Sequence, residues 1–506
     1  MSETSMGATR RDLLKGVAAG AAVCLASTPG DAEAAAGPSA LRRTGPAALG
    51  VAPEAVGAFI DAVNARVGGL HSFMIMRRGQ VAAEAWWAPY AAHSPHMLYS
   101  LSKSFTSTAV GFAVSEGLLT VEDPVVGFFP EDRPAAVSPN LAAMKVRHLL
   151  SMSTGHAQDA TGGTTQAPDG NWVKAFLGLP VEKQPGSLFV YNSAATYMLS
   201  AIVQKLTGKG LVDYLMPRLF APLGIAKPTW ETCPKGIATG GWGLNVTTED
   251  IARFGHCYLQ KGEWQGKPVI PAEWVVEATR KHVNNGSEPN SDWAQGYGYQ
   301  FWRCRHGAYR GDGAFGQYCI VMPEQEAVLA ITSGVGDMQA VLNCVWEKLL
   351  PGMGPEPVAS DGQAALDRKI AALTVPAPAP ATGAGPAPGV IGRTYRLEEN
   401  TLMAATARLT RGALTLEGEG KPTKLSFGLT RWVPGRAPLM GRPGVRCAGR
   451  AAWTAPDTLT IKLCFTETPY EETLTCTFAG RSITVASKLN VGFGPTEGAA
   501  LRGVAE

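Results

Sequence analysis

The chain has 506 residues, of which 45% are hydrophobic and 17% are charged, and its formal net charge is +3. A chain of this length can form two or three domains, and the largest can bury a substantial core. The small net charge and the lack of a clustered Lys/Arg tract argue against nucleic-acid binding and favour a protein that acts on small molecules. No Cys-x-x-Cys or His-Glu-x-x-His spacing occurs, so the sequence does not support a metal site.

Residues 1–36 have the pattern of an export signal. Arg10 and Arg11 are paired, and a leucine pair, Lys15 and a short apolar run follow them. The apolar run is too short to span a bilayer, and small residues around positions 34–36 offer cleavage sites. The segment resembles a twin-arginine signal, so we expect a periplasmic or secreted protein without an integral membrane segment after signal removal. An amphipathic N-terminal helix is the alternative.

The next part of the chain, residues 51–352, predicts one α+β domain. Apolar residues recur at helical spacing over 53–69 and at 338–350, and the region 101–280 is mostly helical with long loops. Strand patterns occur at 72–87 (two strands around a turn), 296–304, 317–323 and 327–334. Strands near both ends, with helices between them, predict a sheet flanked by helices and interrupted by a helical insertion.

The C-terminal part is predicted to be a separate all-β domain. Residues 353–389 are interpreted as a Pro/Ala/Gly-rich linker, of which 375–389 is the clearest stretch. Short alternating strands with turn residues between them fill residues 390–506, which predicts a small sandwich or barrel. Cys464 and Cys476 stand on two of these strands as candidate cross-strand neighbours, although sequence alone does not fix disulfide connectivity.

The stretch Ser100-Leu-Ser-Lys103 is a candidate catalytic motif at the start of an apolar helical stripe. Residues three apart share a helix face, so Lys103 can reach the Ser100 hydroxyl. The helix N-terminus supplies free N–H groups and a positive field, and burial would lower the pKa of the lysine so that a neutral amine can act as base. A Ser N-cap followed by a solvated Lys is the simpler alternative.

The segments "LYSLSKSFTSTAVGFAVSEGLLTVEDPV" and "VRHLLSMSTGH" resemble the serine β-lactamase / penicillin-binding-protein superfamily, within it the class C-like branch. That branch includes family VIII carboxylesterases and 6-aminohexanoate-dimer hydrolases. The resemblance implies a β-lactamase/transpeptidase-like fold and an antiparallel sheet. It also implies a catalytic tyrosine, matched by Tyr191, and a mechanism without cofactor or metal. Ser193 stands where this branch has the asparagine of Tyr-x-Asn, which changes the hydrogen bond offered to a substrate.

The third superfamily motif matches Gly311-Asp312-Gly313. The resemblance implies that Gly311 and Gly313 border the substrate and that the backbone N–H groups of Ser100 and Ala314 form an oxyanion hole. The same glycines, with Gly316, spell the Gly-x-Gly-x-x-Gly pattern of dinucleotide-binding turns. They lead into a strand instead of a helix, so NAD or FAD binding is disfavoured and a turn between two strands is expected.

The sequence therefore predicts an exported serine hydrolase that works through a Ser100 acyl-enzyme. Glycine replaces the usual lysine of the third motif, which favours a linear amide, short peptide or ester over a β-lactam. Arg310 is an alternative anchor for a substrate carboxylate. The other hypotheses are a catalytically silent module that binds cell-wall peptides or proteins, and a true class C-type β-lactamase or D-Ala-D-Ala carboxypeptidase.

Other nucleophile arrangements find little support in the sequence. No Gly-x-Ser-x-Gly elbow occurs, which disfavours an α/β-hydrolase triad. His148 and His156 lie in the second resembling segment and are interpreted as structural, because Lys and Tyr already supply a base. The sequence does not indicate the natural substrate or the oligomeric state.

Overall fold

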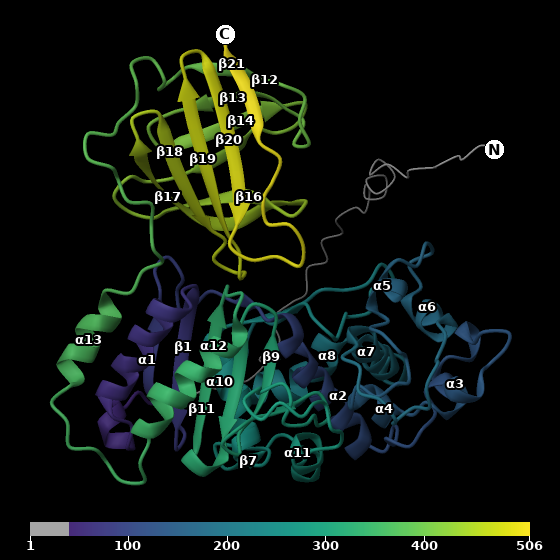
Figure 1. The fold of residues 1–506 in the computed structure, drawn as a ribbon. Helices are drawn as coiled ribbons and strands as arrows, with labels where there is room; N and C mark the ends of the chain where they lie inside the picture. The colour runs from purple at the N-terminus through teal and green to yellow at the C-terminus, as the bar shows by residue number, and fades with distance from the viewer. Residues whose placement is uncertain (1–39) are drawn as a thin grey trace, which may run out of the picture. The chain divides into compact units, whose positions relative to one another are not determined.

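The computed structural model describes residues 40–506 (Figure 1), so the predicted export signal lies outside the described residues. The helices are α1 (Pro53–Arg66), α2 (Ser102–Ser115), α3 (Pro139–Ala143), α4 (Val146–Leu150), α5 (Thr161–Thr165), α6 (Trp172–Gly178), α7 (Ser193–Thr207), α8 (Leu211–Leu215), α9 (Ala221–Leu223), α10 (Thr248–Leu259), α11 (Ala272–Thr279), α12 (Met338–Cys344) and α13 (Gln363–Ala371). No helix in this part of the chain combines the length and apolar character that crossing a membrane requires.

The first large sheet is six-stranded and antiparallel, with the order β2-β1-β11-β10-β9-β8. Its strands are β1 (Leu70–Arg77), β2 (Gln80–Trp86), β8 (Trp302–Arg303), β9 (Tyr309–Gly313), β10 (Gln317–Met322) and β11 (Ala327–Ser333). Two short ribbons complete this half of the molecule: β3 (His96–Met97), β5 (Leu244–Val246) and β4 (Thr229–Trp230) in one, and β6 (Glu263–Trp264) and β7 (Lys267–Pro268) in the other.

Helices cover both faces of this sheet (Figure 1), so its central strands β1, β11, β10 and β9 are buried throughout, whereas the edge strands β2 and β8 contain half-buried residues. Successive side chains of a strand point to opposite faces. Met74 and Met76 of β1 therefore join the core that contains α2 and α10, whereas Phe73 and Ile75 join the core that contains α1 and α12. The predicted α+β class and the sheet flanked by helices are confirmed.

Helix α2 belongs to the helical segment between β2 and β8 and runs through the core that this segment shares with α10. All its residues from Ser102 to Ala113 are buried, and the ring of Phe105 stacks on that of Phe254 in α10 with centroids 3.9 Å apart. A helix buried on every side needs apolar or small residues all round. Ser104, Thr106 and Thr108 of α2 meet this need by donating hydrogen bonds to backbone carbonyls, as Thr108 does to Ser104 at 2.8 Å.

The segment 296–304 forms much less strand than its sequence predicts. Only Trp302–Arg303 pairs as β8, because the preceding backbone turns through left-handed conformations at Gly296 and Gln300. The Gln300 side chain is buried and hydrogen-bonds to Thr196 Oγ1 at 2.7 Å, which ties this turn to α7. The alternating aromatic residues of the segment therefore pack in the core as a loop.

The C-terminal sheet has ten antiparallel strands in the order β15-β14-β13-β12-β21-β20-β19-β18-β17-β16. They are β12 (Thr394–Leu397), β13 (Ala404–Leu409), β14 (Ala413–Gly418), β15 (Thr423–Ser426), β16 (Val433–Leu439), β17 (Arg442–Ala455), β18 (Thr458–Cys464), β19 (Glu471–Ala479), β20 (Ser482–Leu489) and β21 (Leu501–Ala505). Gly428, just after β15, bridges to Arg450 of β17. The sheet thus curls toward closure, which resolves the sandwich-or-barrel alternative as a near-barrel.

The suggested Cys464–Cys476 pairing is wrong. Both thiols are free and buried, and in the β18–β19 ladder Cys464 stands opposite Glu471 while Cys476 stands opposite Leu459. The two cysteines lie at opposite ends of the paired strands, because the tight connection between β18 and β19 brings together the residues nearest to it. Within residues 353–389, which were interpreted as a linker, helix α13 packs its Leu366 into the core that contains α1.

The ten-stranded sheet contacts the domain that contains the six-stranded sheet, residues 51–352, through two short connections between its own strands. Glu467, between β18 and β19, accepts a hydrogen bond at 2.9 Å from the amide of Met97. Asn490, just after β20, donates from Nδ2 to the carbonyl of Gly334 at 3.0 Å. A Cβ at Gly334 would lie 2.0 Å from the carbonyl oxygen of Pro469, so only glycine permits this approach.

Candidate active site

Ser100 lies in a short 3-10 turn, Tyr99–Leu101, that leads directly into α2. This is the position, at the first turn of a buried helix, that the sequence predicts. Tyr99 has a φ of +48°, which is uncommon for a non-glycine residue. The Tyr99 ring is held by edge-on contacts with Phe315 and Phe493, at centroid distances of 5.5 and 5.6 Å. The surrounding aromatic packing therefore fixes the backbone immediately before Ser100.

Lys103 is the centre of the hydrogen-bond network and is only 1% exposed. Its Nζ lies 3.0 Å from Ser100 Oγ, 2.9 Å from Ser193 Oγ and 2.7 Å from the carbonyl oxygen of Gly241. These three partners use all the hydrogen-bonding capacity of the amine. A neutral amine with these partners keeps its lone pair for one hydroxyl hydrogen, and the Ser100 hydroxyl is in reach to supply it.

The electrostatic environment of Lys103 favours the neutral amine. Burial lowers the pKa of Lys103 to about 7, although the negative charges of Asp159 and Asp312 oppose the shift. Within residues 40–506 no carboxylate forms an ion pair with this lysine. Desolvation without a paired anion is the condition under which a lysine loses its proton near neutral pH.

Tyr191 lies on the other side of Ser100, in the loop that precedes α7. Lys103 Nζ is 4.9 Å from the centre of the Tyr191 ring. Burial raises the pKa of the Tyr191 phenol and the charge of Asp312 adds to the effect, whereas a hydrogen bond with Ser100 lowers it. The net shift is upward, so the phenol carries its proton at neutral pH. The Tyr191 ring stacks on the Trp302 indole, with centroids 5.3 Å apart.

The two residues that follow Tyr191 in the Tyr191-Asn192-Ser193 motif have different partners in the protein. Asn192 is the N-cap of α7, and its Oδ1 accepts hydrogen bonds from the amides of Ala194 and Ala195. Asparagine is therefore present but serves the helix. Ser193 stands at the motif position itself, and its hydroxyl accepts a hydrogen bond from Lys103. The structure brings Ser100, Lys103, Tyr191 and Ser193 together around one amine.

Strand β9 forms a further wall, and its two glycines allow it to lie close to the start of α2. A Cβ on Gly311 would come within 2.5 Å of Ser104 Oγ, and one on Gly313 would lie 1.9 Å from the carbonyl oxygen of Leu98. Neither glycine is among the described residues that line the cavity, so substrate binding by them stays a prediction. The β9–turn–β10 hairpin confirms the turn between two strands that was expected in place of a dinucleotide fingerprint.

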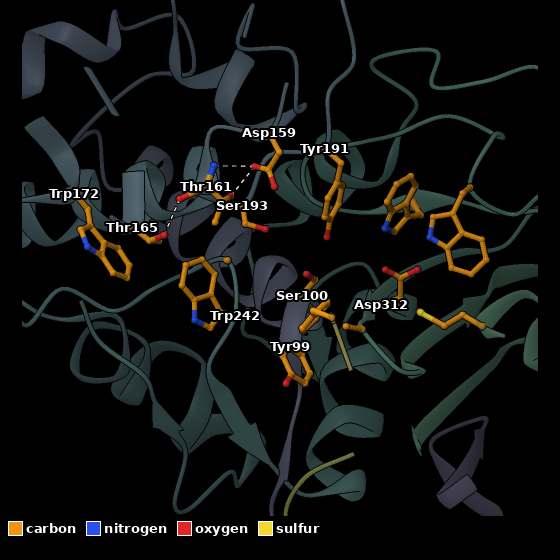
Figure 2. A pocket seen from close by; sticks show the side chains of 16 residues that line it. Tyr99, Ser100, Asp159, Thr161, Thr165, Trp172, Tyr191, Ser193, Trp242 and Asp312 are labelled. Carbon is orange, nitrogen blue, oxygen red and sulfur yellow. Dashed lines mark hydrogen bonds between the residues drawn. The ribbon is translucent and has the colours of Figure 1, made fainter. Parts of the chain in front are cut away.

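A cavity of about 770 Å³ opens in front of Ser100. Ser193, Tyr191 and Ala314 also line it. Its walls are largely aromatic, through Tyr99, Trp172, Trp242, Trp293, Trp302 and Phe493. Figure 2 shows Ser100 and Tyr191 side by side at its centre, with Asp159 and Asp312 to either side.

One wall residue comes from the C-terminal sheet. Phe493 lies in the connection between β20 and β21 and is 76% exposed. Its ring contacts those of Tyr99 and Phe315, at centroid distances of 5.6 and 4.9 Å. The two tyrosine hydroxyls of Tyr99 and Tyr470 also share a hydrogen bond at 2.5 Å. The near-barrel thus contributes directly to the mouth of the cavity.

Arg310 is not available as an anchor for a substrate carboxylate. Its side chain is fully buried and binds Asp312 Oδ2 through Nε at 2.9 Å and Nη2 at 2.8 Å. Its Nη1 donates to the carbonyl of Asp292 at 2.7 Å, and its guanidinium lies 4.3 Å from the centre of the Trp293 ring. The anchor hypothesis is therefore wrong, because Arg310 is fully buried and its guanidinium is already engaged by Asp312 and by the carbonyl of Asp292.

The two histidines of the second resembling segment have structural surroundings. His148 Nδ1 accepts a hydrogen bond from the amide of Lys145 at 3.0 Å, and burial lowers the pKa of His148 to about 4. His156 Nδ1 lies 2.9 Å from Thr154 Oγ1. Neither histidine is among the described residues that line the cavity. No group of His, Cys, Asp and Glu suited to a metal ion occurs within residues 40–506.

Sequence reasoning missed three contributors to the site. The carbonyl of Gly241 left no trace in the sequence, because any residue carries a carbonyl. Phe493 stands some 390 residues from Ser100 in an otherwise unremarked loop. Asp312 could have been found, since the period of two along β9 places it opposite the two packed glycines.

A family model described as Beta-lactamase matches residues 57–340, more than half of the chain. The chain belongs to the beta-lactamase family. It is 26% identical over 289 residues to the 6-aminohexanoate-dimer hydrolase of Paenarthrobacter ureafaciens, covering 53% of this chain and 73% of that protein. It is also 25% identical over 292 residues to penicillin-binding protein 4 of Amycolatopsis lactamdurans, covering 50% and 75%.

Among solved structures, the D-amino acid amidase of Ochrobactrum anthropi SV3 is similar to the chain with a TM-score of 0.47 and 20% identity. The match covers 59% of this chain and 97% of the amidase. The family assignment confirms the predicted superfamily resemblance and its fold. This family includes serine hydrolases with amidase and esterase relatives.

Proposed function

We propose that this protein is an exported serine hydrolase that cleaves a linear amide or ester bond through an acyl-enzyme on Ser100. The observation that carries the proposal is the buried Lys103 amine, 3.0 Å from Ser100 Oγ, with its pKa lowered to about 7. A serine hydroxyl is a weak nucleophile until a neighbouring base removes its proton. Lys103 supports this role at neutral pH without help from a histidine.

The first half of the reaction forms the acyl-enzyme. As Ser100 Oγ attacks the substrate carbonyl carbon, its proton passes to Lys103 Nζ, and the tetrahedral oxyanion is held by the backbone N–H groups of Ser100 and Ala314. One such donor is worth about 3 kcal/mol of transition-state stabilisation. The Tyr191 phenol donates its proton to the leaving amine or alcohol and regains one from Lys103. The scissile bond breaks and the acyl group stays on Ser100.

The second half repeats these steps with water in place of the leaving group. A water molecule attacks the acyl carbonyl and transfers a proton to the Lys103–Tyr191 pair. The Ser100 ester bond then breaks and Ser100 Oγ recovers its proton. Ser193 holds the Lys103 amine in place throughout, through the 2.9 Å contact.

The lining of the cavity supports linear substrates over β-lactams. Among the described residues that line it, none is a Lys or Arg, and Arg310 is engaged with Asp312. A β-lactam or a peptide C-terminus carries a carboxylate, which a cationic side chain binds most strongly. The aromatic walls favour the apolar part of an amide or ester.

The test is covalent labelling of Ser100 followed by intact-mass measurement. Purified protein is treated with a fluorophosphonate probe, and hydrolysis of p-nitrophenyl butyrate and nitrocefin is measured in parallel. We expect one phosphonyl adduct, lost in Ser100→Ala, and ester hydrolysis well above nitrocefin hydrolysis.

Ser115→Ala, which removes a hydroxyl at the far end of α2, is the matched control and should label normally. An unlabelled Ser100, with ester hydrolysis unchanged in Ser100→Ala, would exclude the hydrolase and favour a silent binding module. Dominant nitrocefin hydrolysis would identify a β-lactamase instead. Export is tested separately, by locating the protein in cells that carry Arg10→Lys/Arg11→Lys.

A further inference from the structure

The charged residues around Ser100 are acidic on the side that a ligand meets. Asp159 and Asp312 both line the cavity, and none of the described lining residues is a Lys or Arg. The fields of both carboxylates reach the catalytic groups, because each one raises the pKa of Lys103 and of Tyr191. Figure 2 shows these two aspartates on either side of Ser100 and Tyr191. A substrate therefore meets two carboxyl groups, and no Lys or Arg side chain, among these lining residues.

Asp312 is the better placed of the two carboxylates for recognising a ligand. It is only 5% exposed, yet it lines the cavity. Burial raises the pKa of the Asp312 carboxyl, and the charge of Arg310 opposes that rise. A carboxylate in such a site gains from a further positive charge.

The contacts of Arg310 orient Asp312 and leave part of it available. Both the 2.9 Å hydrogen bond and the 2.8 Å ion pair end on Asp312 Oδ2, and the Trp302 side chain also hydrogen-bonds to this carboxyl. A carboxylate has about four acceptor sites, so these contacts leave it with acceptor capacity toward the cavity. Arg310 itself is fixed from behind by Asp292 and Cys304. A charge held this rigidly has a small entropic cost when it binds a ligand.

The aromatic walls complement a cation. Arg310 lies 5.7 and 4.3 Å from the centres of the Trp302 and Trp293 rings, and Tyr191 stacks on Trp302. A ligand therefore meets only the remaining surface of these two rings, which also line the cavity. Aromatic faces attract ammonium groups as well, by about 0.5–2 kcal/mol each. The cavity thus combines a buried carboxylate with aromatic surfaces, as sites for organic ammonium ions do.

We propose that the enzyme selects substrates that carry an ammonium group near the scissile amide or ester bond, and that Asp312 binds this group. Asp312 acts as a specificity determinant and Arg310 as its positioning residue. The inference rests on the proposed hydrolase function. It extends that function by naming the charge of the substrate, which the Ser-Lys-Tyr arrangement leaves open.

The test compares probes that differ only in charge. On the acyl side, 6-aminohexanoyl p-nitroanilide is paired with heptanoyl p-nitroanilide; on the leaving-group side, acetylthiocholine is paired with 3,3-dimethylbutyl thioacetate. We expect at least one cationic probe to exceed its neutral partner about tenfold or more in kcat/KM at low salt, as a charged hydrogen bond allows. In Asp312→Asn the ratio between the two probes should fall below about threefold when both are measured on the alkaline plateau, where Lys103 is neutral in both proteins.

Asp159→Asn is the matched control, because it removes the other cavity carboxylate, whose Oδ1 is bonded to Thr161. Asp159 is exposed, so this variant should keep most of the preference. A ratio near one in both wild-type pairs would overturn the proposal. So would an equal loss on both probes in Asp312→Asn, or a loss of preference confined to Asp159→Asn.

A binding experiment separates this inference from the proposed hydrolysis and does not need Asp312→Asn to fold. Calorimetry with Ser100→Ala measures the binding of hexylammonium and of hexanoate without turnover. Hexylammonium should bind at least tenfold more tightly than hexanoate, and high salt should weaken its binding only moderately. Equal or tighter binding of hexanoate would refute the cation site, whether or not Ser100 is acylated.

Discussion

The start of helix α2 and strand β9 each bury a basic side chain beside the same cavity. Their environments have opposite effects on the positive charge: that of Lys103 is disfavoured and that of Arg310 is favoured. Lys103 on α2 has only hydroxyl and carbonyl partners, so desolvation dominates and its pKa falls to about 7. Arg310 on β9 is paired with Asp312. Burial opposes its charge, but Cys304 and Asp312 outweigh burial and raise its pKa. One region supplies a base and the other a fixed ion pair.

Burial alone therefore does not turn a basic side chain into a catalytic base. Guanidinium stays protonated and forms directed bonds to a carboxylate, which suits a structural role. An ammonium group loses its proton readily when it is buried without an anion, which suits proton transfer.

Replacing the cation of α2 should abolish most activity. Lys103→Met keeps the length of the side chain and removes the base, so kcat/KM for p-nitrophenyl butyrate should fall about 10²–10⁴-fold. The thermal midpoint should fall only slightly, because no ion pair is lost although the Gly241 carbonyl loses a hydrogen bond. Activity within threefold of wild type would show that Lys103 is not the base.

Replacing the cation of β9 should destabilise the fold. Arg310→Met leaves Asp312 buried without its partner, which costs about 3–5 kcal/mol of unfolding free energy, measured by urea denaturation. The double variant Arg310→Met/Asp312→Asn should recover part of this loss. The exposed pair Arg66–Glu347 is the control, and Arg66→Met should leave the urea midpoint unchanged. An unchanged midpoint in Arg310→Met would contradict the structural role.

The pH profile reports the proton on Lys103. The active form is the neutral amine, whose fraction grows as pH rises through the lowered pKa of about 7. Log kcat/KM should therefore rise with a slope near one below pH 7 and level off above it. Since the charge of Asp312 raises this pKa, Asp312→Asn should move the limb to lower pH. An acid limb absent between pH 5 and 8 would contradict the assignment.

Phe493 links the two regions, because its ring contacts Tyr99 before α2 and Phe315 after β9. Phe493→Ala should widen the mouth of the cavity and raise KM for the neutral ester about two- to fivefold, with kcat little changed. Leu402→Ala, which trims another exposed apolar side chain of the C-terminal sheet, is the control. A large loss of kcat would show that Phe493 shapes the reacting groups and not only the entrance.

The sequence predicted more of the hydrolase-like part than of its surroundings. Strands β1, β2, β10 and β11 follow apolar runs, and α1 and α12 follow helical periodicity. The alternating pattern of residues 296–304 predicted a longer strand than the structure has. Left-handed turns at Gly296 and Gln300 interrupt the strand without changing the composition of the run. In the C-terminal sheet, strands rich in Arg, Gly and Pro, such as β17, gave no alternating pattern.

Within the site, contacts between residues that are close along the chain could be predicted from the sequence alone. Three residues separate Ser100 from Lys103, so helix geometry alone brings them into contact. The two glycines of β9 likewise indicate that another part of the backbone lies close to this strand.

The surroundings of Ser100 and Lys103 depend on the tertiary structure and could not be predicted from the sequence. Gly241, Ser193, Asp312 and Phe493 come from distant parts of the chain, and their arrangement depends on packing between elements. Packing removed water from Lys103, gave Arg310 a partner and left Asp312 facing the cavity. Because desolvation and charge pairing are properties of a three-dimensional environment, the chemistry of these residues emerged only when the fold brought them together.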